Sequence, residues 1–293
     1  MPRIRTLLIL GRVSNLPTVW SNCLAGWWLG GSGNPDKLPL LLAGATLLYL
    51  AGMYLNDAFD AKFDSEYRRE RPIPCGAIGE RDVWTMGLVL MAAGGTCLFM
   101  LGILTGIMGS LLMLCIVIYD AVHKNVKSAP VLMAACRFFL YLTAASTGVL
   151  GVTGWAIWCG LALALYIIGL SFLASRESTG GALAYWPCAL LATPIVLAIV
   201  MNANEYLKTA ALLSVALALW IARSLRNAFS ATSRNVGKAV SGLLAGIVLV
   251  DLIAIADAVK PVNEMPDAFQ PFGLAFIGLF LLALLTQRFV PAT

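Results

Sequence analysis

The chain has 293 residues, of which 60% are hydrophobic and only 12% are charged, and its formal net charge is +5. A soluble domain is about half apolar and a quarter charged, so this chain holds more apolar side chain than a water-soluble fold of its size can bury. The composition also excludes a disordered or collagen-like chain. We expect a polytopic membrane protein.

Ten apolar runs approach the 20 residues or so that a helix needs to cross the hydrocarbon core. They cover residues 13–31, 38–55, 83–101, 103–119, 130–150, 153–174, 184–201, 207–222, 239–257 and 271–289. Only Gly102 separates the third run from the fourth, which predicts an antiparallel hairpin. We expect one all-α transmembrane domain over residues 1–293, with nine or ten spans around a central cavity that opens at the cytoplasmic side. The first run is expected to remain as a span.

Positive residues concentrate on one side of this bundle. If the ten runs alternate in direction, seventeen of the twenty Lys and Arg residues share a side: Arg3, Arg5, Arg12, Lys62, Arg68, Arg69, Arg71, Arg81, Lys124, Lys127, Arg137, Arg176, Arg223, Arg226, Arg234, Lys238 and Arg288. Only Lys37, Lys208 and Lys260 fall on the other side. Because positive residues are retained in the cytoplasm, both termini and the loops after even-numbered runs are expected there. These loops explain the net charge, so no nucleic-acid partner is expected.

An acidic motif follows the second run directly. If the helix continues, Asn56, Asp60 and Asp64 recur at every fourth position and share one face, with Asp57 close beside them. Like charges at this spacing repel, and carboxylates near a membrane are costly without a partner. A divalent cation offsets both costs, and oxygen ligands favour Mg²⁺. The alternative is a solvated acidic start to the loop.

Basic residues come next in the same loop and after the fourth run. Arg71 precedes a Pro-Ile-Pro turn that should end the helix, and its guanidinium suits phosphate oxygens. Tyr119 and Lys124 flank the exit of the fourth run, where they could hold a leaving phosphate or anchor the helix at the interface. Asp120 and His123 are candidate proton acceptors, although a single interfacial histidine is more often incidental.

These motifs together resemble the UbiA superfamily of intramembrane prenyltransferases. The resemblance rests on Gly11-Arg12-Val-Ser-Asn15-Leu-Pro17-Thr-Val-Trp-Ser-Asn22, on Asn56-Asp57-x-x-Asp60-x-x-x-Asp64 and on Arg71-Pro72-Ile-Pro-x-Gly76. Together with the pattern of runs it covers most of the chain. It implies a helical bundle that uses Mg²⁺ to bind an isoprenyl diphosphate and passes the prenyl group to an acceptor.

The resemblance also implies roles for individual residues. Asn56, Asp60 and Asp64 would be magnesium ligands, with Asp57 as an alternate. Arg71 and Lys124 would hold the diphosphate, and Arg12, Asn15 and Asn22 would line the polar floor of the cavity. The full set of candidates is Asp60, Asp64, Lys124 and Asp120 for catalysis, Arg12, Asn15, Asn22, Arg71, Tyr119, Arg137 and Arg176 for substrate binding, and Asn56, Asp57, Asp60, Asp64 and Glu177 for the metal.

The segment after the sixth run departs from the family pattern. A second acidic element, D-x-x-x-D, is expected there, but the only carboxylate is Glu177, which adjoins Arg176. The departure implies either a single magnesium ion, with Arg176 neutralising phosphate, or loss of activity. It resembles a divergent UbiA-like branch found in small bacterial biosynthetic operons, which implies a bacterial inner membrane.

The sequence therefore predicts Mg²⁺-dependent transfer of an isoprenyl group to an aromatic ring or another small nucleophile within the bilayer. Two alternatives stay open. The missing second acidic element suggests a relative without activity that binds or moves a lipid-linked precursor. Asp251 and Asp257 in the ninth run suggest an ion-coupled transporter, since acids within membranes often mark ion pathways.

Overall fold

A computed structural model describes residues 4–124, 126–179, 185–201, 207–229, 235–257 and 266–290, and of 176–179, 207–210, 257 and 266–271 only the backbone. Within this part of the chain all regular secondary structure is helical. The helices are α1 (Ile4–Leu10), η1 (Val13–Asn15), α2 (Leu16–Leu29), η2 (Pro35–Lys37), α3 (Leu38–Phe59), α4 (Ala61–Tyr67), α5 (Glu80–Met100), α6 (Ile103–Val122), α7 (Ala129–Ala145), α8 (Gly154–Thr179), α9 (Trp186–Leu191), α10 (Thr193–Met201), α11 (Leu207–Phe229), α12 (Val236–Asp257) and α13 (Pro266–Thr286). The all-α prediction is confirmed for these residues.

Several helices are long and apolar enough to cross a membrane. Among the described residues they are Pro35–Phe59, Glu80–Met100, Ile103–Val122, Gly154–Ser175, Ala211–Phe229 and Val236–Ala256, and Ala129–Ala145, Trp186–Met201 and Phe272–Thr286 are shorter apolar helices. On α5 and α6, Leu88, Val89, Phe99, Leu104 and Ile107 are exposed, as side chains that face lipid would be. The chain has the character of an integral membrane protein, while the count of nine or ten spans stays a prediction.

The turns follow the local sequence. Gly102 joins α5 to α6 with φ 144°, a backbone conformation that favours glycine, and the two helices pack together as the predicted hairpin. The seventh apolar run divides into α9 and α10 because Pro194 has no N–H for the carbonyl of Leu190. The hydroxyl of Thr193 donates to that carbonyl instead, at 2.7 Å.

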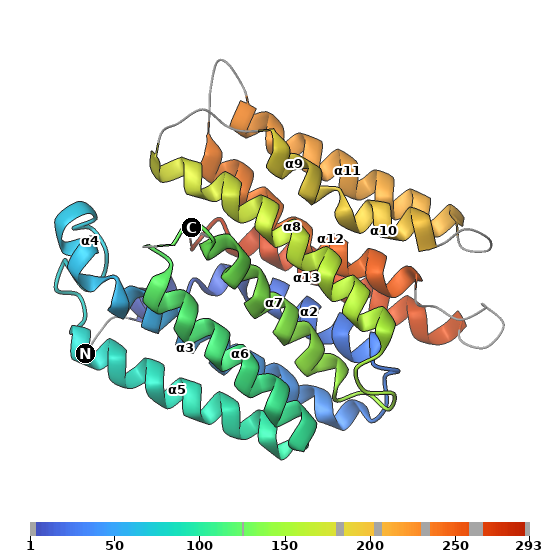
Figure 1. Cartoon of the computed structure of the whole chain (residues 1–293), viewed down its shortest axis with the longest axis horizontal. Coiled ribbons are helices and arrows are strands. Elements are labelled where there is room, and N and C mark those ends of the chain that lie inside the picture. The colour runs from blue at the N-terminus through green and yellow to red at the C-terminus, as the bar shows by residue number, and fades with distance from the viewer. Residues whose placement is uncertain are drawn as a thin grey trace.

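Helix α2 occupies the middle of the bundle, where it contacts α3, α7, α12 and α13 (Figure 1). One apolar cluster joins it to α3, α5, α6 and α7, and another to α8, α11 and α12. A Cβ atom on Gly26 would lie 2.5 Å from the carbonyl oxygen of Tyr141, so α2 and α7 approach to a distance that only glycine permits. Thr18, Ser21 and Asn22 on this central helix are completely buried, and buried polar groups need polar partners.

Candidate active site

The acidic motif lies where α3 meets α4, at one end of the bundle (Figure 1). The N–H of Asp60 donates to the carbonyl of Asn56 at 3.0 Å, and that of Asp64 donates to the carbonyl of Asp60 at 2.9 Å. The helical hydrogen-bond pattern therefore continues through the junction, and the three residues recur on one face. Their side chains are buried. The helix ends at Tyr67, before Pro72 and Pro74, as the prolines predict.

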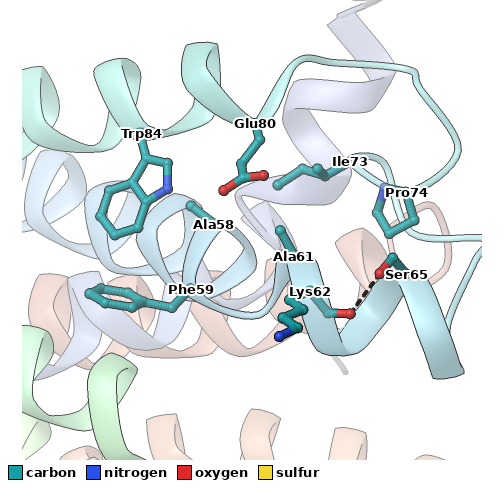
Figure 2. A pocket seen from close by; sticks show the side chains of 9 residues that line it. All are labelled: Ala58, Phe59, Ala61, Lys62, Ser65, Ile73, Pro74, Glu80 and Trp84. Atoms are coloured by element: carbon teal, nitrogen blue, oxygen red, sulfur yellow. Dashed lines mark hydrogen bonds between the residues drawn. The ribbon is translucent and has the colours of Figure 1, made fainter.

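The opposite face of this segment borders a separate pocket of about 480 Å³. Figure 2 shows the side chains that line it, among them Lys62 and Glu80, one charge of each sign. The rings of Phe59 and Trp84 meet edge to face there, with centroids 4.7 Å apart. No predicted site residue lines this pocket. This pocket and the acidic motif thus lie on different faces of the segment.

Asp60 connects the junction to the end of α6. Lys124 Nζ lies 2.8 Å from its Oδ1, and His123 Nε2 lies 3.4 Å from its Oδ2. Burial raises the pKa of Asp60, but the contacts with His123 and Lys124 outweigh it and leave the pKa below its ordinary value. Burial lowers the pKa of His123, and its contact with Asp60 more than offsets this, so that pKa is raised. The Asp60 carboxylate is therefore stabilised in its ionised form.

Aromatic rings support both of these basic side chains. The Tyr119 ring stacks on His123 with centroids 5.0 Å apart, and Lys124 Nζ lies 3.8 Å from the centroid of the Phe63 ring. A cation over an aromatic face is attracted by the ring quadrupole. Lys124 is thus held between Asp60 and Phe63, close to where the sequence predicts a phosphate.

Asp57 pairs with two arginines that come from opposite sides of the motif. Arg12 Nη2 and Arg71 Nη1 each lie 3.6 Å from its Oδ1. Both arginines are partly exposed, whereas Asp57 is buried. Asp57, the predicted alternate metal ligand, therefore brings together Arg71, predicted to hold the diphosphate, and Arg12, predicted to line the polar floor of the cavity.

Arg12 adopts a strained backbone conformation at this point. Its φ of 41° and ψ of 49° lie in the left-handed region, which is unusual for a residue with a side chain and costs about 1 kcal/mol or more. The Tyr49 hydroxyl donates to the Arg12 carbonyl at 3.0 Å. This contact from α3 holds the turn that directs Arg12 toward Asp57.

Replacing Tyr49 by Phe should therefore loosen the turn. We expect Tyr49→Phe to lower the free energy of unfolding by about 1 kcal/mol, the usual contribution of a single hydrogen bond. The measurement is thermal unfolding in detergent micelles. Tyr67→Phe is the matched control because Tyr67 is exposed, and equal loss in the two variants would contradict this role of Tyr49.

Asp120 lies behind the motif on α6 and is buried. Asn56 Nδ2 donates to its Oδ1 at 3.3 Å. Its Oδ2 and the Oδ1 of Asp64 are buried without a hydrogen-bond partner in the described structure. Burial raises the pKa of Asp64 above its ordinary value. In the described structure, Oδ2 of Asp120 and Oδ1 of Asp64 are thus available to accept a cation or a proton.

The donor set fits magnesium, which prefers oxygen ligands. Carboxylate and amide oxygens of Asn56, Asp60 and Asp64 lie on this face of the helix, and Oδ1 of Asp64 has no hydrogen-bond partner in the described structure. In the part of the chain that the structure describes, no three His, Cys, Asp or Glu side chains converge on one point. Mg²⁺ does not require such convergence, because it keeps waters and takes substrate phosphates as further ligands beside one or two carboxylates.

Arg137 lies away from the cytoplasmic loop to which its charge was assigned. It falls in the middle of α7, where its Nη1 donates to Asn22 Oδ1 at 2.9 Å and its Nη2 donates to Thr18 Oγ1 at 3.1 Å. Counting charges alone does not show how deep a residue lies in the bundle, where a partly buried arginine can be accommodated by polar partners on a neighbouring helix. Asn15, which is buried next to this turn of α2, receives the Thr18 hydroxyl on its carbonyl at 2.7 Å.

Arg137 also lines a cavity of about 90 Å³ between α2, α3, α6 and α7. Its polar lining comes from Tyr49, Tyr119, Asp120 and Arg137, and the other lining side chains are chiefly apolar. Ligand pockets usually measure about 300–1,000 Å³, so side chains must move before a prenyl chain can enter. The predicted candidates Tyr119, Asp120 and Arg137 thus meet at one cavity wall.

Two candidates cannot be placed in the site. Arg176 and Glu177 belong to the last turns of α8, but their side chains lie outside the described residues. The sequence analysis did not identify Thr18, which accepts a hydrogen bond from Arg137, or Tyr49, which donates to the Arg12 carbonyl. It also gave His123 little weight. The four-residue spacing of Thr18 and Asn22, which places both on one face of α2, was a signal that could have identified Thr18.

A sequence model described as the UbiA prenyltransferase family matches residues 15–239. Among curated proteins, the 4-hydroxybenzoate octaprenyltransferase of Edwardsiella ictaluri is 33% identical over 82 residues, which are 27% of this chain and 29% of that protein. The digeranylgeranylglyceryl phosphate synthase of Methanosarcina mazei is 31% identical over 112 residues, or 36% of this chain and 38% of that protein. These alignments span only about a third of the relatives' lengths.

Solved structures match over most of the chain. A UbiA homologue from Aeropyrum pernix K1 superposes with a TM-score of 0.65 at 17% identity, over 86% of this chain and 99% of that one. A UbiA homologue from Archaeoglobus fulgidus bound to GPP and Mg²⁺ gives a TM-score of 0.52 at 13% identity, over 96% and 98%. At these identities the likeness establishes the fold.

The all-helical fold and the paired acidic and basic motifs define the class of intramembrane prenyltransferase-like proteins. The chain belongs to the UbiA prenyltransferase family, whose sequence model covers residues 15–239.

Proposed function

We propose that this protein transfers an isoprenyl group from an isoprenyl diphosphate to a nucleophilic acceptor within the membrane. One observation carries the proposal: the buried carboxylates of Asp57 and Asp60 each contact basic side chains, Arg12 and Arg71 for the first and Lys124 for the second. Carboxylates for a metal and cations for phosphate are thereby adjacent at one end of an apolar bundle. The named activities of the curated relatives are consistent with this function.

The basic residues bind the diphosphate in this proposal. Arg71 and Arg12 exchange the Asp57 carboxylate for phosphate oxygens, and Lys124 does the same from Asp60. Asn56, Asp60 and Asp64 would hold Mg²⁺, which when bound would neutralise negative charge on the leaving diphosphate. Because the basic side chains already lie beside the carboxylates before the substrate arrives, their positive charges are close to where negative charge develops on the diphosphate.

The acceptor reacts at the first carbon of the prenyl group. The bond from that carbon to the diphosphate oxygen breaks and its electron pair leaves with the diphosphate, while a lone pair of the acceptor or a π pair of its ring forms the new bond to carbon. The proton that the acceptor loses passes to Oδ2 of Asp120, which is buried and unpaired. The cavity that Asp120 lines extends among Leu112, Ile116 and Leu140, apolar side chains suited to the prenyl chain.

The location of the site follows from the charge distribution. We propose that the loops after even-numbered runs and both termini face the cytoplasm, in the inner membrane of a bacterium. The diphosphate would then reach the motif from the aqueous side, while the prenyl chain stays within the apolar bundle. A membrane site suits a substrate whose chain is itself lipid-soluble.

Binding of isoprenyl diphosphates tests this function without knowledge of the acceptor. Radiolabelled isoprenyl diphosphates from C10 to C40 would be titrated onto the protein in nanodiscs, with Mg²⁺ and with EDTA. We expect saturable binding at one range of chain lengths, lost in EDTA because uncompensated phosphate and carboxylate charges then face each other. Absence of binding at every length would overturn the proposal and favour a role in handling another lipid-linked precursor.

A further inference from the structure

Asp251 is a buried acid that the proposed reaction does not use. It lies within α12 and is completely inaccessible to solvent. Its Oδ2 accepts a hydrogen bond from Ser21 Oγ at 2.5 Å and another from Asn22 Nδ2 at 2.7 Å. Both donors belong to α2, so this carboxylate joins α12 to the central helix of the bundle.

The hydrogen bonds continue from Asp251 to the cavity. The amide of Asn22 donates through Nδ2 to Asp251 and accepts through Oδ1 from Arg137 Nη1 at 2.9 Å. This arrangement fixes which way the amide faces, because its nitrogen can only donate and its oxygen can only accept. Asp251, Asn22 and Arg137 are thus linked by continuous hydrogen bonds across α12, α2 and α7.

Asp251 is the acid that these hydrogen bonds connect to Arg137. Its Oδ2 lies 2.5 Å from Ser21 Oγ and 2.7 Å from Asn22 Nδ2, and its Oδ1 is buried with no hydrogen-bond partner in the described structure. Arg137 is always positive, and no carboxylate of the described residues lies within ion-pair distance of it. Asp251 and Arg137 thus lie on opposite sides of the Asn22 amide, where an ionised Asp251 would supply the counter-charge for Arg137.

We propose that Asp251 is a positioning residue for substrate binding: acting through Asn22, it neutralises Arg137 and holds the guanidinium against the cavity. A cation that is partly buried within the bundle is costly without a counter-charge, and an arginine without a fixed partner adopts many rotamers. One N–H of Arg137 Nη1 donates to Asn22, and one N–H of its Nη2 donates to Thr18. The other N–H groups of the guanidinium are available to bind an anionic ligand. This role rests on the proposed function.

Thermal unfolding tests the charge pairing without any substrate. Asp251→Asn keeps an oxygen that can accept from Ser21 and Asn22 but removes the charge. We expect it to lower Tm by about 5 °C or more, because Arg137 is left unpaired. The double variant Asp251→Asn/Arg137→Gln should regain most of the Tm that Asp251→Asn loses. If the Tm of the double variant instead falls by the sum of the decreases in the two single variants, the pairing is overturned.

Asp120→Asn is the matched control, since its carboxylate bonds to Asn56, and Arg137→Gln should not restore that variant.

Ligand binding tests whether Asp251 acts through Arg137. The probe is the radiolabelled isoprenyl diphosphate that the wild type binds in Mg²⁺. We expect Asp251→Asn to raise its Kd about tenfold, an effect typical of residues that orient a binding group, and to have no further effect once Arg137 is Gln. An equal additional loss in the Arg137→Gln background would overturn the positioning role. If the wild type binds no isoprenyl diphosphate, the proposed function fails, while the unfolding cycle still decides the charge pairing.

Discussion

Asp60→Asn should abolish the magnesium-dependent binding of isoprenyl diphosphate while leaving the bundle folded. Asp60 lies at the centre of the acidic face and also contacts Lys124 and His123. Its replacement removes a charge from the proposed metal surface and frees Lys124 from its partner. We expect affinity in Mg²⁺ to fall at least about 100-fold, as when a single preorganised electrostatic contact is removed from an active site. Filter binding with labelled substrate in nanodiscs measures the change.

Glu66→Gln is the matched control for this variant. Glu66 lies on the same short helix, α4, but its side chain is exposed. It should bind the substrate as the wild type does, and both variants should keep the helical circular dichroism of the wild type. Retained magnesium-dependent binding in Asp60→Asn would refute the assignment of this face as the metal site.

Lys124→Ala should cause the second large loss. The ammonium group lies 2.8 Å from Asp60 Oδ1 and 3.8 Å from the centre of the Phe63 ring, a position from which it can turn to a phosphate oxygen. Without it, one positive charge is missing where the leaving diphosphate gathers negative charge. We expect the rate of diphosphate release to fall about 100-fold, measured as pyrophosphate formed from a saturating isoprenyl diphosphate in the presence of an acceptor that the wild type prenylates.

Lys127→Ala provides the comparison within the same loop. Lys127 is exposed, and it forms no ion pair with any residue that the structure describes. Its loss should leave the rate within about twofold of the wild type, as for most surface substitutions. Lys124→Arg should recover part of the lost rate, since the charge is kept. Equal rates for Lys124→Ala and Lys127→Ala would exclude a role for Lys124 in catalysis.

Most of the fold was predictable because each helix carries its own signal. Apolar runs of nearly membrane length located the helices, and Gly102 marked a hairpin that the structure confirms. The prediction that Asn56, Asp60 and Asp64 share one helical face is also confirmed, because backbone hydrogen bonds continue through the junction at Asp60. Local periodicity and turn chemistry are properties of adjacent residues, and sequence alone contains them.

The pairings between distant helices could not be predicted in the same way. Asp57 joins Arg12 and Arg71, and Asp251 joins Ser21 and Asn22, contacts that depend on which helices lie side by side. Arg137 was placed with the loop charges because charge counting ignores depth within the bundle. The division of the seventh run at Ala192 also depended on whether Pro194 would bend or break the helix.

Prenyl transfer itself is the most direct test of the proposed function. Wild-type protein and Asp60→Asn would be incubated in nanodiscs with Mg²⁺, a labelled isoprenyl diphosphate and, in separate reactions, an aromatic acid such as 4-hydroxybenzoate and a glycerol phosphate. Mass spectrometry would detect the prenylated product. The proposed function predicts a product with at least one acceptor class, dependent on Mg²⁺ and absent from the Asp60→Asn reaction. A product that forms equally in Asp60→Asn or in EDTA would contradict it.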